Sequence, residues 1–240
     1  MKKERQFMKI EQLDNYEAMS RRGAEILFNE ISNNPYANIC LATGESPRRM
    51  YELLVEMIHV NQLDVSHLTF TKLDEWCGLN AKDDSTCEWF IRHYVLEPLN
   101  IKEEQLISFN NDAADTECEA KRIHDLIDMH PIDCCILGLG KNGHLGLNEP
   151  ADELIPDAHV IQLDELSKHH GMLKGKKVEQ GITLGLSELL NAKKILMLIS
   201  GSGKAEILQR LMSKKVSTAL PASFLWLHND VACLINKEMK

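Results

Sequence analysis

The sequence predicts an α/β fold in which a doubly wound, mostly parallel sheet is flanked by helices, in a Rossmann-like arrangement. Two observations predict it. Short apolar runs of strand length alternate with longer runs whose apolar residues recur at helical spacing. The 240 residues carry no repeat and no Gly/Ser-rich linker, so residues 1–240 are expected to form a single domain. In such a sheet the ligand crevice lies outside the carboxyl ends of the strands.

Each expected element follows from its local pattern. The run at 132–138 is short and apolar, as in the centre of a sheet, whereas the run at 68–73 alternates between apolar and polar residues. Strands are predicted at 38–43, 68–73, 132–138, 194–200 and 231–235. Helices are predicted at about 11–32, 47–60, 87–98, 114–129 and 203–212.

The charge balance excludes two classes of partner. With 27 Lys+Arg against 36 Asp+Glu, the formal net charge is −9, whereas proteins that bind nucleic acids or anionic membranes need a cationic face. We therefore expect no nucleic-acid and no membrane partner. An anionic ligand would have to be held by local donors, such as the N–H groups at a helix start and one or two lysines.

The cysteines indicate a reducing compartment. There are seven, an odd number, and no C-x-x-C pair occurs, so reduced thiols in the core of a cytoplasmic protein are expected. No stretch is apolar for the ~18 residues that a membrane span needs, and no apolar segment follows the basic N-terminus as in a signal peptide. Neither a cofactor nor a metal site is expected, since no ligand set of suitable spacing surrounds the candidate residues.

Two strand ends carry candidate anion-binding loops. Residues 43–47 (Thr-Gly-Glu-Ser-Pro) join a strand to a helix, and residues 201–204 (Gly-Ser-Gly-Lys) do the same later in the chain. Glycine permits close backbone approach, and the free N–H groups of a helix start attract anions. Taken alone, each could instead be a capped turn without a ligand.

The other two strand ends carry acid/base residues. Asp74 and Glu75 end the second strand, and because neighbouring side chains on a strand point to opposite sides, one of them is expected to enter the crevice. The Gly-rich run at 138–150 contains His144 and Glu149, and an imidazole oriented by a carboxylate is a usual arrangement for proton transfer near neutral pH. A solvated acidic pair and a structural histidine are the plainer alternatives. His169 and His170 are expected on a solvated helix surface.

Three runs of the sequence resemble a known family. Leu-Asp-Glu-Trp (73–76) and Gly-Lys-Asn-Gly-His-Leu-Gly-Leu-Asn-Glu-Pro (140–150) are similar to the glucosamine-6-phosphate deaminases, and together with the run at 216–228 they most resemble the galactosamine-6-phosphate isomerases that deaminate. The similarity covers nearly the whole chain in order. The 6-phosphogluconolactonases share the fold but lack the Asn-Glu-Pro ending, so residues 148–150 favour a deaminase.

The resemblance implies a reaction and a role for each residue. His144 would open the sugar ring, with Glu149 and Asn142 orienting it, and Asp74 would move the C2 proton toward C1 as ammonia leaves. The product from galactosamine 6-phosphate would be tagatose 6-phosphate, and such an enzyme would be classed as a hydrolase as well as an isomerase and deaminase. The residues that would hold the phosphate are Thr43, Gly44, Glu45, Ser46 and Lys204.

The sequence departs from the family pattern in two places. Position 142 is Asn where some relatives carry Asp, and Asn can orient an imidazole but cannot share charge with it. The family's phosphate-binding arginine would fall near Leu173, where Lys174 is the available cation, a point charge rather than a fork. The chain also ends without the longer tail of allosteric hexameric relatives, which implies weak or absent effector regulation.

Four functions remain open at this stage. The first is deamination of galactosamine 6-phosphate, and the second is deamination of glucosamine 6-phosphate to fructose 6-phosphate. The two sugars differ only at C4, and no residue can be identified that reads this difference. A lactonase and a non-catalytic sugar-phosphate sensor are the remaining alternatives, although the ~35 residues before the first predicted strand leave little room for a DNA-binding extension. The sequence does not indicate an oligomeric state.

Overall fold

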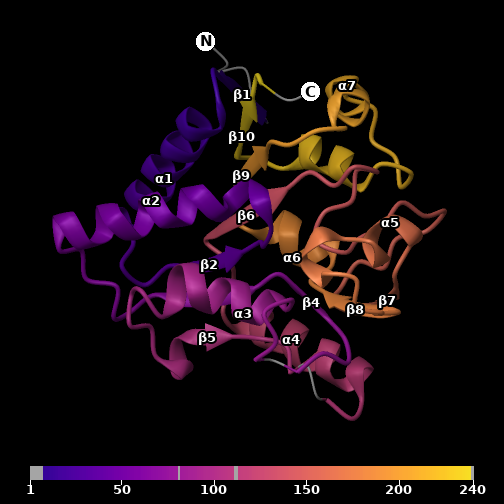
Figure 1. Ribbon diagram of the computed structural model, residues 1–240, viewed down its shortest axis with the longest axis horizontal. Coiled ribbons are helices and arrows are strands. Elements are labelled where there is room, and N and C mark those ends of the chain that lie inside the picture. The colour runs from indigo at the N-terminus through magenta and orange to yellow at the C-terminus, as the bar shows by residue number, and fades with distance from the viewer. Residues whose placement is uncertain (1–7, 81, 111–112, 239–240) are drawn as a thin grey trace.

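The computed structural model describes residues 8–80, 82–110 and 113–238. Its main sheet has seven strands in the order β1-β10-β9-β6-β2-β3-β5, and all neighbours pair in parallel (Figure 1). The strands are β1 (Met8–Leu13), β2 (Asn38–Leu41), β3 (Thr69–Lys72), β5 (Leu106–Ile107), β6 (Cys134–Gly138), β9 (Lys194–Ile199) and β10 (Val231–Asn236). The mostly parallel α/β sheet predicted from the sequence is confirmed.

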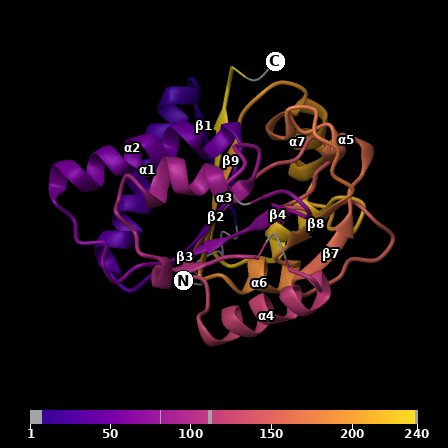
Figure 2. The same ribbon diagram turned by 60° about the horizontal axis from the view of Figure 1, so that its bottom comes forward.

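Helices cover both faces of this sheet. α1 and α2 lie on one side, and α6 and α7 lie on the other (Figure 2). The α-helices are α1 (Tyr16–Asn33), α2 (Glu45–Asn61), α3 (Cys87–Ile91), α4 (Thr116–Met129), α5 (Glu165–Lys168), α6 (Leu186–Asn191) and α7 (Ala205–Met212). A π-helical turn (Arg92–Leu96) continues α3, and 3₁₀ turns span Glu103–Gln105, Gly171–Leu173 and Pro221–Leu227. The doubly wound arrangement therefore holds.

A second, antiparallel sheet was not predicted. Its order is β4-β8-β7, formed by β4 (Asp74–Trp76), β8 (Gln180–Thr183) and β7 (His159–Gln162). β4 follows β3 after one residue, so the chain passes directly from the main sheet into the second one. Strands of three or four residues carry too few positions for an alternating pattern to stand out. This sheet matters for function because β4 begins with Asp74.

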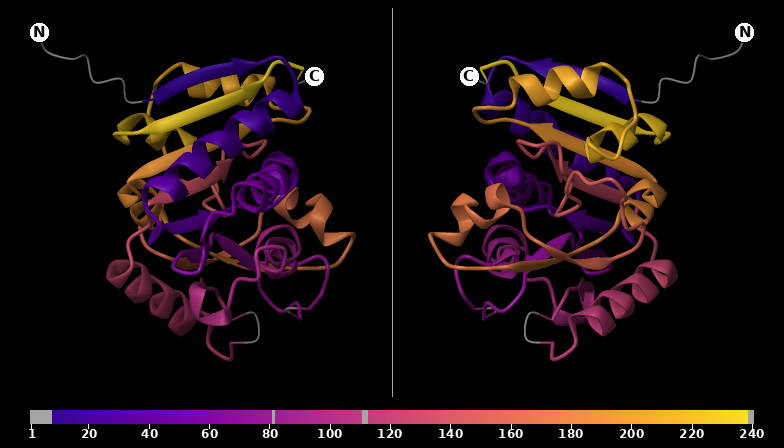
Figure 3. Two further views of the ribbon diagram at one scale, coloured as in Figure 1. Left: turned by 90° about the vertical axis from the view of Figure 1, so that its left-hand side faces the viewer. Right: turned by 90° about the vertical axis from the view of Figure 1, so that its right-hand side faces the viewer.

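The helix predicted at 11–32 begins too early. Met8–Leu13 is instead an edge strand that pairs with β10, so the first and last strands lie side by side (Figure 3). α1 starts at Tyr16, where the side chain of Asn15 accepts a hydrogen bond from the N–H of Ala18 at 2.8 Å. Asn is a preferred N-cap residue, which explains this start. Other predicted boundaries differ from the observed ones by a few residues.

The thiols are distributed less uniformly than expected. Cys40, Cys87, Cys134, Cys135 and Cys233 are buried and Cys77 is partly buried, but Cys118 is exposed on α4. All seven are free, in agreement with the expectation of reduced cysteines. Within the described residues, no helix combines the length and the apolar character that crossing a bilayer requires.

Candidate active site

The sheet order brings the four predicted strand-end motifs together. They follow β9, β6, β2 and β3, which are consecutive neighbours in the main sheet. All four strands run in parallel, so their carboxyl ends lie along one edge. Side chains that come from segments far apart in the sequence therefore share one crevice edge, and the contacts below show how they are oriented.

His144 is oriented by two neighbours from its own loop. Its Nδ1 lies 3.2 Å from Oε2 of Glu149, and its backbone N–H donates to Oδ1 of Asn142 at 3.1 Å. The amide of Asn142 also donates to Glu149 at 2.6 Å and to Asp164 at 3.0 Å. An ionised carboxylate only accepts, so Nδ1 of His144 carries the hydrogen and Nε2 is left for another partner. Asn142 thus fixes both members of the pair.

Glu149 is held as a carboxylate although it is buried. Burial opposes its ionisation, but the hydrogen bond and charge of His144, with hydrogen bonds from Ser167 and Asn142, outweigh this effect and lower the pKa of Glu149 below its ordinary value. The hydroxyl of Ser167 donates to Oε1 of Glu149, and the N–H of Ser167 donates to Asp164. Sequence reasoning missed Ser167 and Asp164, because their spacing indicates only the capped start of a short helix.

A glycine makes room for the imidazole. A Cβ atom added to Gly140 would lie 2.4–2.6 Å from ring atoms of His144. Such distances are far below van der Waals contact, so any side chain here would push the ring away. Gly140 therefore contributes to the site because its missing side chain leaves room for the ring of His144.

Asp74 lies in the second sheet beside this loop. Its carboxylate is 9% exposed, and a Cβ added to Gly146 would lie 3.5 Å from its Oδ2. The pKa of Asp74 is raised to about 6, mainly by burial and then by the neighbouring Glu75 carboxylate, against the opposing effects of the Cys87 thiol and of the charges of His144 and Lys72. A carboxylate with a pKa near 6 is a much better base near neutral pH than an ordinary aspartate.

Glu75 has a structural task on the opposite side of β4. Its Oε1 accepts from the N–H groups of Trp76 at 2.8 Å and Cys87 at 3.0 Å, while Oε2 accepts from Glu88 N at 2.9 Å and from the ammonium of Lys72 at 2.9 Å. The carboxylate therefore caps the start of α3. The two adjacent acids have different roles, since Glu75 binds backbone N–H groups and Lys72, whereas Asp74 accepts from the thiol of Cys87.

The loop after β2 presents a helix start. Gly44, with φ of 98°, is the N-cap of α2 and offers no side chain to cap the first N–H groups. Ser46 is buried, and the hydroxyl of Thr43 lies 3.4 Å from the thiol of Cys87. The carboxylate of Glu45 instead pairs with Arg48 at 2.9 Å, so Glu45 can offer only its backbone. The uncapped N–H groups can donate hydrogen bonds to a bound anion.

Two lysines and a histidine surround the loop after β9. Burial, together with the smaller effect of the nearby positive charge of Lys141, lowers the pKa of Lys204 to about 8. Burial also lowers the pKa of His170, with smaller contributions from His144, Lys204 and Lys141. Within the part of the chain that the structure describes, no carboxylate lies within ion-pairing distance of Lys141 or Lys204. Their mutual repulsion would be relieved by a bound anion.

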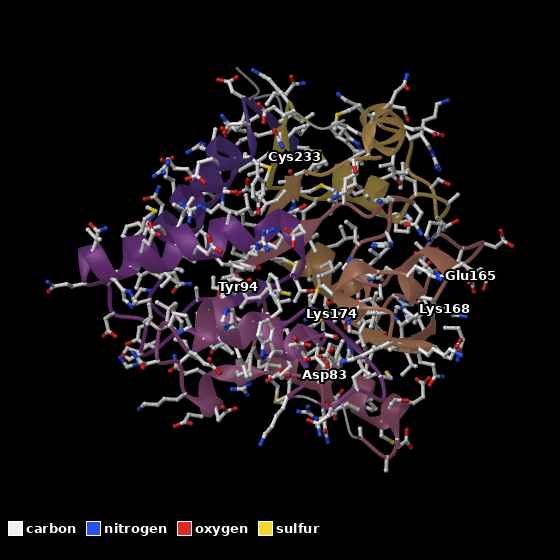
Figure 4. All side chains as sticks on the ribbon, viewed as in Figure 1. Asp83, Tyr94, Glu165, Lys168, Lys174 and Cys233 are labelled. Carbon is white, nitrogen blue, oxygen red and sulfur yellow. The ribbon has the colours of Figure 1, made fainter. Side chains whose placement is uncertain are left out.

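Lys174 is paired with a carboxylate, and the two histidines lie beyond the end of α5. The ammonium of Lys174 lies 2.5 Å from Asp84, and the preceding residue along the chain, Asp83, pairs with Lys176 (Lys174 and Asp83 are labelled in Figure 4). His169 and His170 have exposed surface but do not lie on a helix, because α5 ends at Lys168. The imidazole of His170 is nonetheless partly desolvated by the side chains around it. The ring of His170 lies against Trp76, with centroids 5.8 Å apart. His170 is thus the ionisable group that this segment adds near Lys204.

The structure describes one possible metal-binding group, and it lies outside these motifs. His124, Asp157 and Glu188 place one ligand atom each within 4.8 Å of one another. The carboxylate of Glu188 is already engaged, since Oε1 accepts from Ala158 N at 2.9 Å and Oε2 accepts from Gly185 N at 2.9 Å. The group is therefore accounted for by local hydrogen bonds.

Asn148 ties the loop at 138–150 to the residue that follows β8. Its amide is buried and donates to the carbonyl oxygens of Leu145 at 2.9 Å and Leu184 at 2.8 Å. Asn148→Ala would leave both buried carbonyls without this donor, and we expect a loss of about 1–3 kcal/mol in the free energy of unfolding, measured by urea denaturation. Asn61→Ala on the exposed surface of α2 is the control and should cost within about 0.5 kcal/mol. Equal losses would contradict this role of Asn148.

Comparison with known proteins gives consistent relatives. Residues 12–233 match the family described as glucosamine-6-phosphate isomerases/6-phosphogluconolactonase. The chain is 50% identical over 231 residues to a protein of Escherichia coli (strain K12) named "Putative deaminase AgaI", covering 95% of this chain and 91% of that protein. It is 36% identical over 236 residues to a glucosamine-6-phosphate deaminase of Thermoanaerobacter sp. (strain X514), covering 96% and 93% of the two chains.

The solved structures agree on the fold. A monomeric glucosamine-6-phosphate deaminase superimposes with a TM-score of 0.91 at 32% identity, covering 96% of this chain and 98% of that one. A 6-phosphogluconolactonase from Trypanosoma brucei, with a TM-score of 0.75 and 20% identity, shares the fold alone. The relatives identified by sequence are named deaminases. The expected class of hydrolase is therefore wrong, whereas the expected class of deaminase agrees with these names.

Proposed function

The chain belongs to the family of glucosamine-6-phosphate isomerases and 6-phosphogluconolactonases, and on this premise we propose that it isomerises and deaminates a hexosamine 6-phosphate. One observation carries the proposal: Asp74, with its pKa raised to about 6, lies beside the loop that holds the oriented pair His144–Glu149. Opening a sugar ring and moving a carbon-bound proton are two separate proton transfers, and the site offers a separate group for each.

Ring opening is assigned to His144. Glu149 accepts from Nδ1, so Nε2 can exchange a proton with the ring oxygen or with the hydroxyl at C1. The imidazolium that forms while the proton moves is stabilised by the carboxylate of Glu149, whose ionised form Ser167 and Asn142 support. Asn142 acts by orientation, since a neutral amide adds no charge to the pair.

The isomerising step is assigned to Asp74. In the open-chain sugar it removes the proton at C2, and the enolamine that forms takes up a proton at C1. The resulting imine at C2 exchanges its nitrogen for the oxygen of a water molecule, which yields the ketose 6-phosphate and ammonia. The pKa of about 6 keeps Asp74 ionised at neutral pH while leaving it basic enough to accept this proton.

The phosphate is assigned to the helix start at Thr43, Gly44 and Ser46 and to Lys204. Because the pKa of Lys204 is about 8, this lysine loses its charge as the pH rises through about 8. We expect the KM for a phosphorylated substrate to increase above that pH, with a smaller effect on kcat, because a remote anchor contributes mainly to binding. Steady-state kinetics between pH 6.5 and 9.5 would check this. Lys204→Arg should remove the alkaline rise, since arginine stays charged, and a rise that persists would contradict the assignment.

We further propose galactosamine 6-phosphate as the preferred substrate. The three runs at 73–76, 140–150 and 216–228 support it through their resemblance to deaminating galactosamine-6-phosphate isomerases. The chain is also only 36% identical to a relative named as a glucosamine-6-phosphate deaminase, whereas it is 50% identical to a deaminase whose name specifies no sugar. The free thiols fit a cytoplasmic metabolic role.

Ammonia release tests both levels of the proposal. The purified chain is assayed with galactosamine 6-phosphate and with glucosamine 6-phosphate, and kcat/KM is compared. We expect release from both, with the larger kcat/KM for the galacto sugar. A larger value for glucosamine 6-phosphate would overturn the substrate preference alone. No release from either sugar, in a sample that is folded by circular dichroism, would overturn the deaminase assignment.

A further inference from the structure

The thiol of Cys87 joins the phosphate loop to the proposed base. Its Sγ lies 3.4 Å from Oγ1 of Thr43 and 3.5 Å from Oδ1 of Asp74. These two residues come from different parts of the site, the loop after β2 and the first position of β4. The side chain of Cys87 is 2% exposed, and its backbone N–H is held by the carboxylate of Glu75 at 3.0 Å. The thiol is therefore fixed between the two groups.

The direction of this chain of hydrogen bonds follows from the number of protons. An ionised Asp74 can only accept, so the single S–H of Cys87 is committed to it. The hydroxyl of Thr43 must then be the donor to the sulfur. Burial and the nearby carboxylates of Glu75 and Asp74 raise the pKa of Cys87 well above its ordinary value, so the thiol keeps its proton. The hydrogen bonds therefore run from Thr43 through Cys87 to Asp74.

We propose that Cys87 is a positioning residue that transmits occupancy of the phosphate loop to Asp74; this rests on the proposed function. When a phosphate oxygen binds at the loop, the hydroxyl of Thr43 donates to that oxygen. The lone pairs of Oγ1 then compete with Asp74 for the S–H of Cys87. Asp74 loses part of a hydrogen bond that stabilises its charge, and it becomes a stronger base once the phosphate is bound.

The other groups that face Asp74 do not depend on the hydroxyl of Thr43. Glu75 lies beside it on β4, Lys72 precedes it on β3, and His144 faces it from the loop after β6. Lys72 and Glu75 are fully buried and paired with each other at 2.9 Å. The charge of Asp74 also acts on the thiol of Cys40 and the phenol of Tyr51, whose pKa values are raised mainly by burial, so that both stay neutral. Cys87 is the group that contacts both Thr43 and Asp74.

Infrared spectroscopy can read this thiol directly, because S–H stretching falls where other protein groups do not absorb. The S–H band of Cys87 is identified by subtracting the spectrum of Cys87→Ala from that of wild type. Inorganic phosphate is the probe, and its binding is checked by calorimetry. We expect phosphate to shift the band in wild type and in the control Cys233→Ala, which alters a buried thiol on β10, but not in Thr43→Val. No shift in wild type, an equal shift in Thr43→Val, or failure of phosphate to bind would each overturn the proposal.

Kinetics give a second readout that a merely structural role would not change. The acid limb of the pH profile of kcat/KM reports the pKa of the base in the free enzyme, and the acid limb of kcat reports its pKa in the substrate complex. In wild type we expect the acid limb of kcat to lie about 0.5–1 pH unit above that of kcat/KM. This difference should disappear in Cys87→Ala. It should return in Cys87→Ser, because the hydroxyl of serine also donates and accepts. An unchanged gap in Cys87→Ala would overturn the proposal. The infrared shift needs no turnover, so failure of ammonia release would refute the proposed function without deciding this one.

Discussion

Replacing Asp74 with asparagine should remove the exchange of the C2 proton with solvent and lower kcat/KM by about 10²–10⁴-fold. Asparagine is nearly the same size as aspartate and can still accept from the thiol of Cys87, but it cannot take up a proton at neutral pH. Proton exchange is measured by NMR in deuterated buffer, and ammonia release is measured in parallel. Binding of inorganic phosphate should be nearly unchanged, because the loop after β2 is intact.

The pH dependence gives the same assignment a second test. The pKa of Asp74 is raised, so the group is ionised only above about 6. The rate of C2 proton exchange should fall as the pH decreases through that value, since protonation removes the base. Asp84→Asn, which alters an exposed carboxylate paired with Lys174, is the control and should keep both the rate and the acid limb. Exchange at the wild-type rate in Asp74→Asn would show that another group is the base.

A single methyl group at position 140 should lower kcat by about 10²-fold. The Cβ of Gly140→Ala would lie 2.4–2.6 Å from the ring of His144, and that ring must move by a large fraction of an ångström or more to clear it. Displacing a catalytic group by about 1 Å is sufficient for a loss of this size. The Nδ1 contact with Glu149, now 3.2 Å, would lengthen as well.

A matched control lies two residues away. Gly138 ends β6, and a Cβ added there would meet no heavy atom within 4 Å. Gly138→Ala should therefore keep kcat within a few-fold, while both variants should melt close to the wild-type temperature. Equal kcat values for the two variants, measured as ammonia release, would mean that the position of His144 does not limit the reaction.

Much of the site could be predicted because its parts are close in sequence. Asn142, His144 and Glu149 lie within eight residues of one Gly-rich loop, and their contacts are local. Asp74 was suggested by its place at the end of a predicted strand. The order of the strands then brought these segments together, and strand order depends on the topology that an α/β pattern implies.

The missing parts depend on contacts between distant segments. Ser167 and Asp164 meet Glu149 and Asn142 only after the second sheet has folded, and nothing in their own segment indicates a site. Cys87 looks like an ordinary core thiol until its two partners are known. His169 and His170 lie outside the predicted helix because α5 ends at Lys168, and a short polar helix carries no strong stop signal.

The pairing of the first strand with the last has a consequence for how the chain folds during synthesis. β1 leaves the ribosome early, but its partner β10 is made at the other end of the described chain. β9, which carries the loop before Lys204, also waits for β10 along one of its two edges. β1 and one edge of β9 therefore stay unpaired until Val231–Asn236 has been made, and non-local parallel pairing of this kind is slow. A nascent chain stalled just before residue 231 should be digested by protease at its N-terminal segment, whereas the released protein should resist.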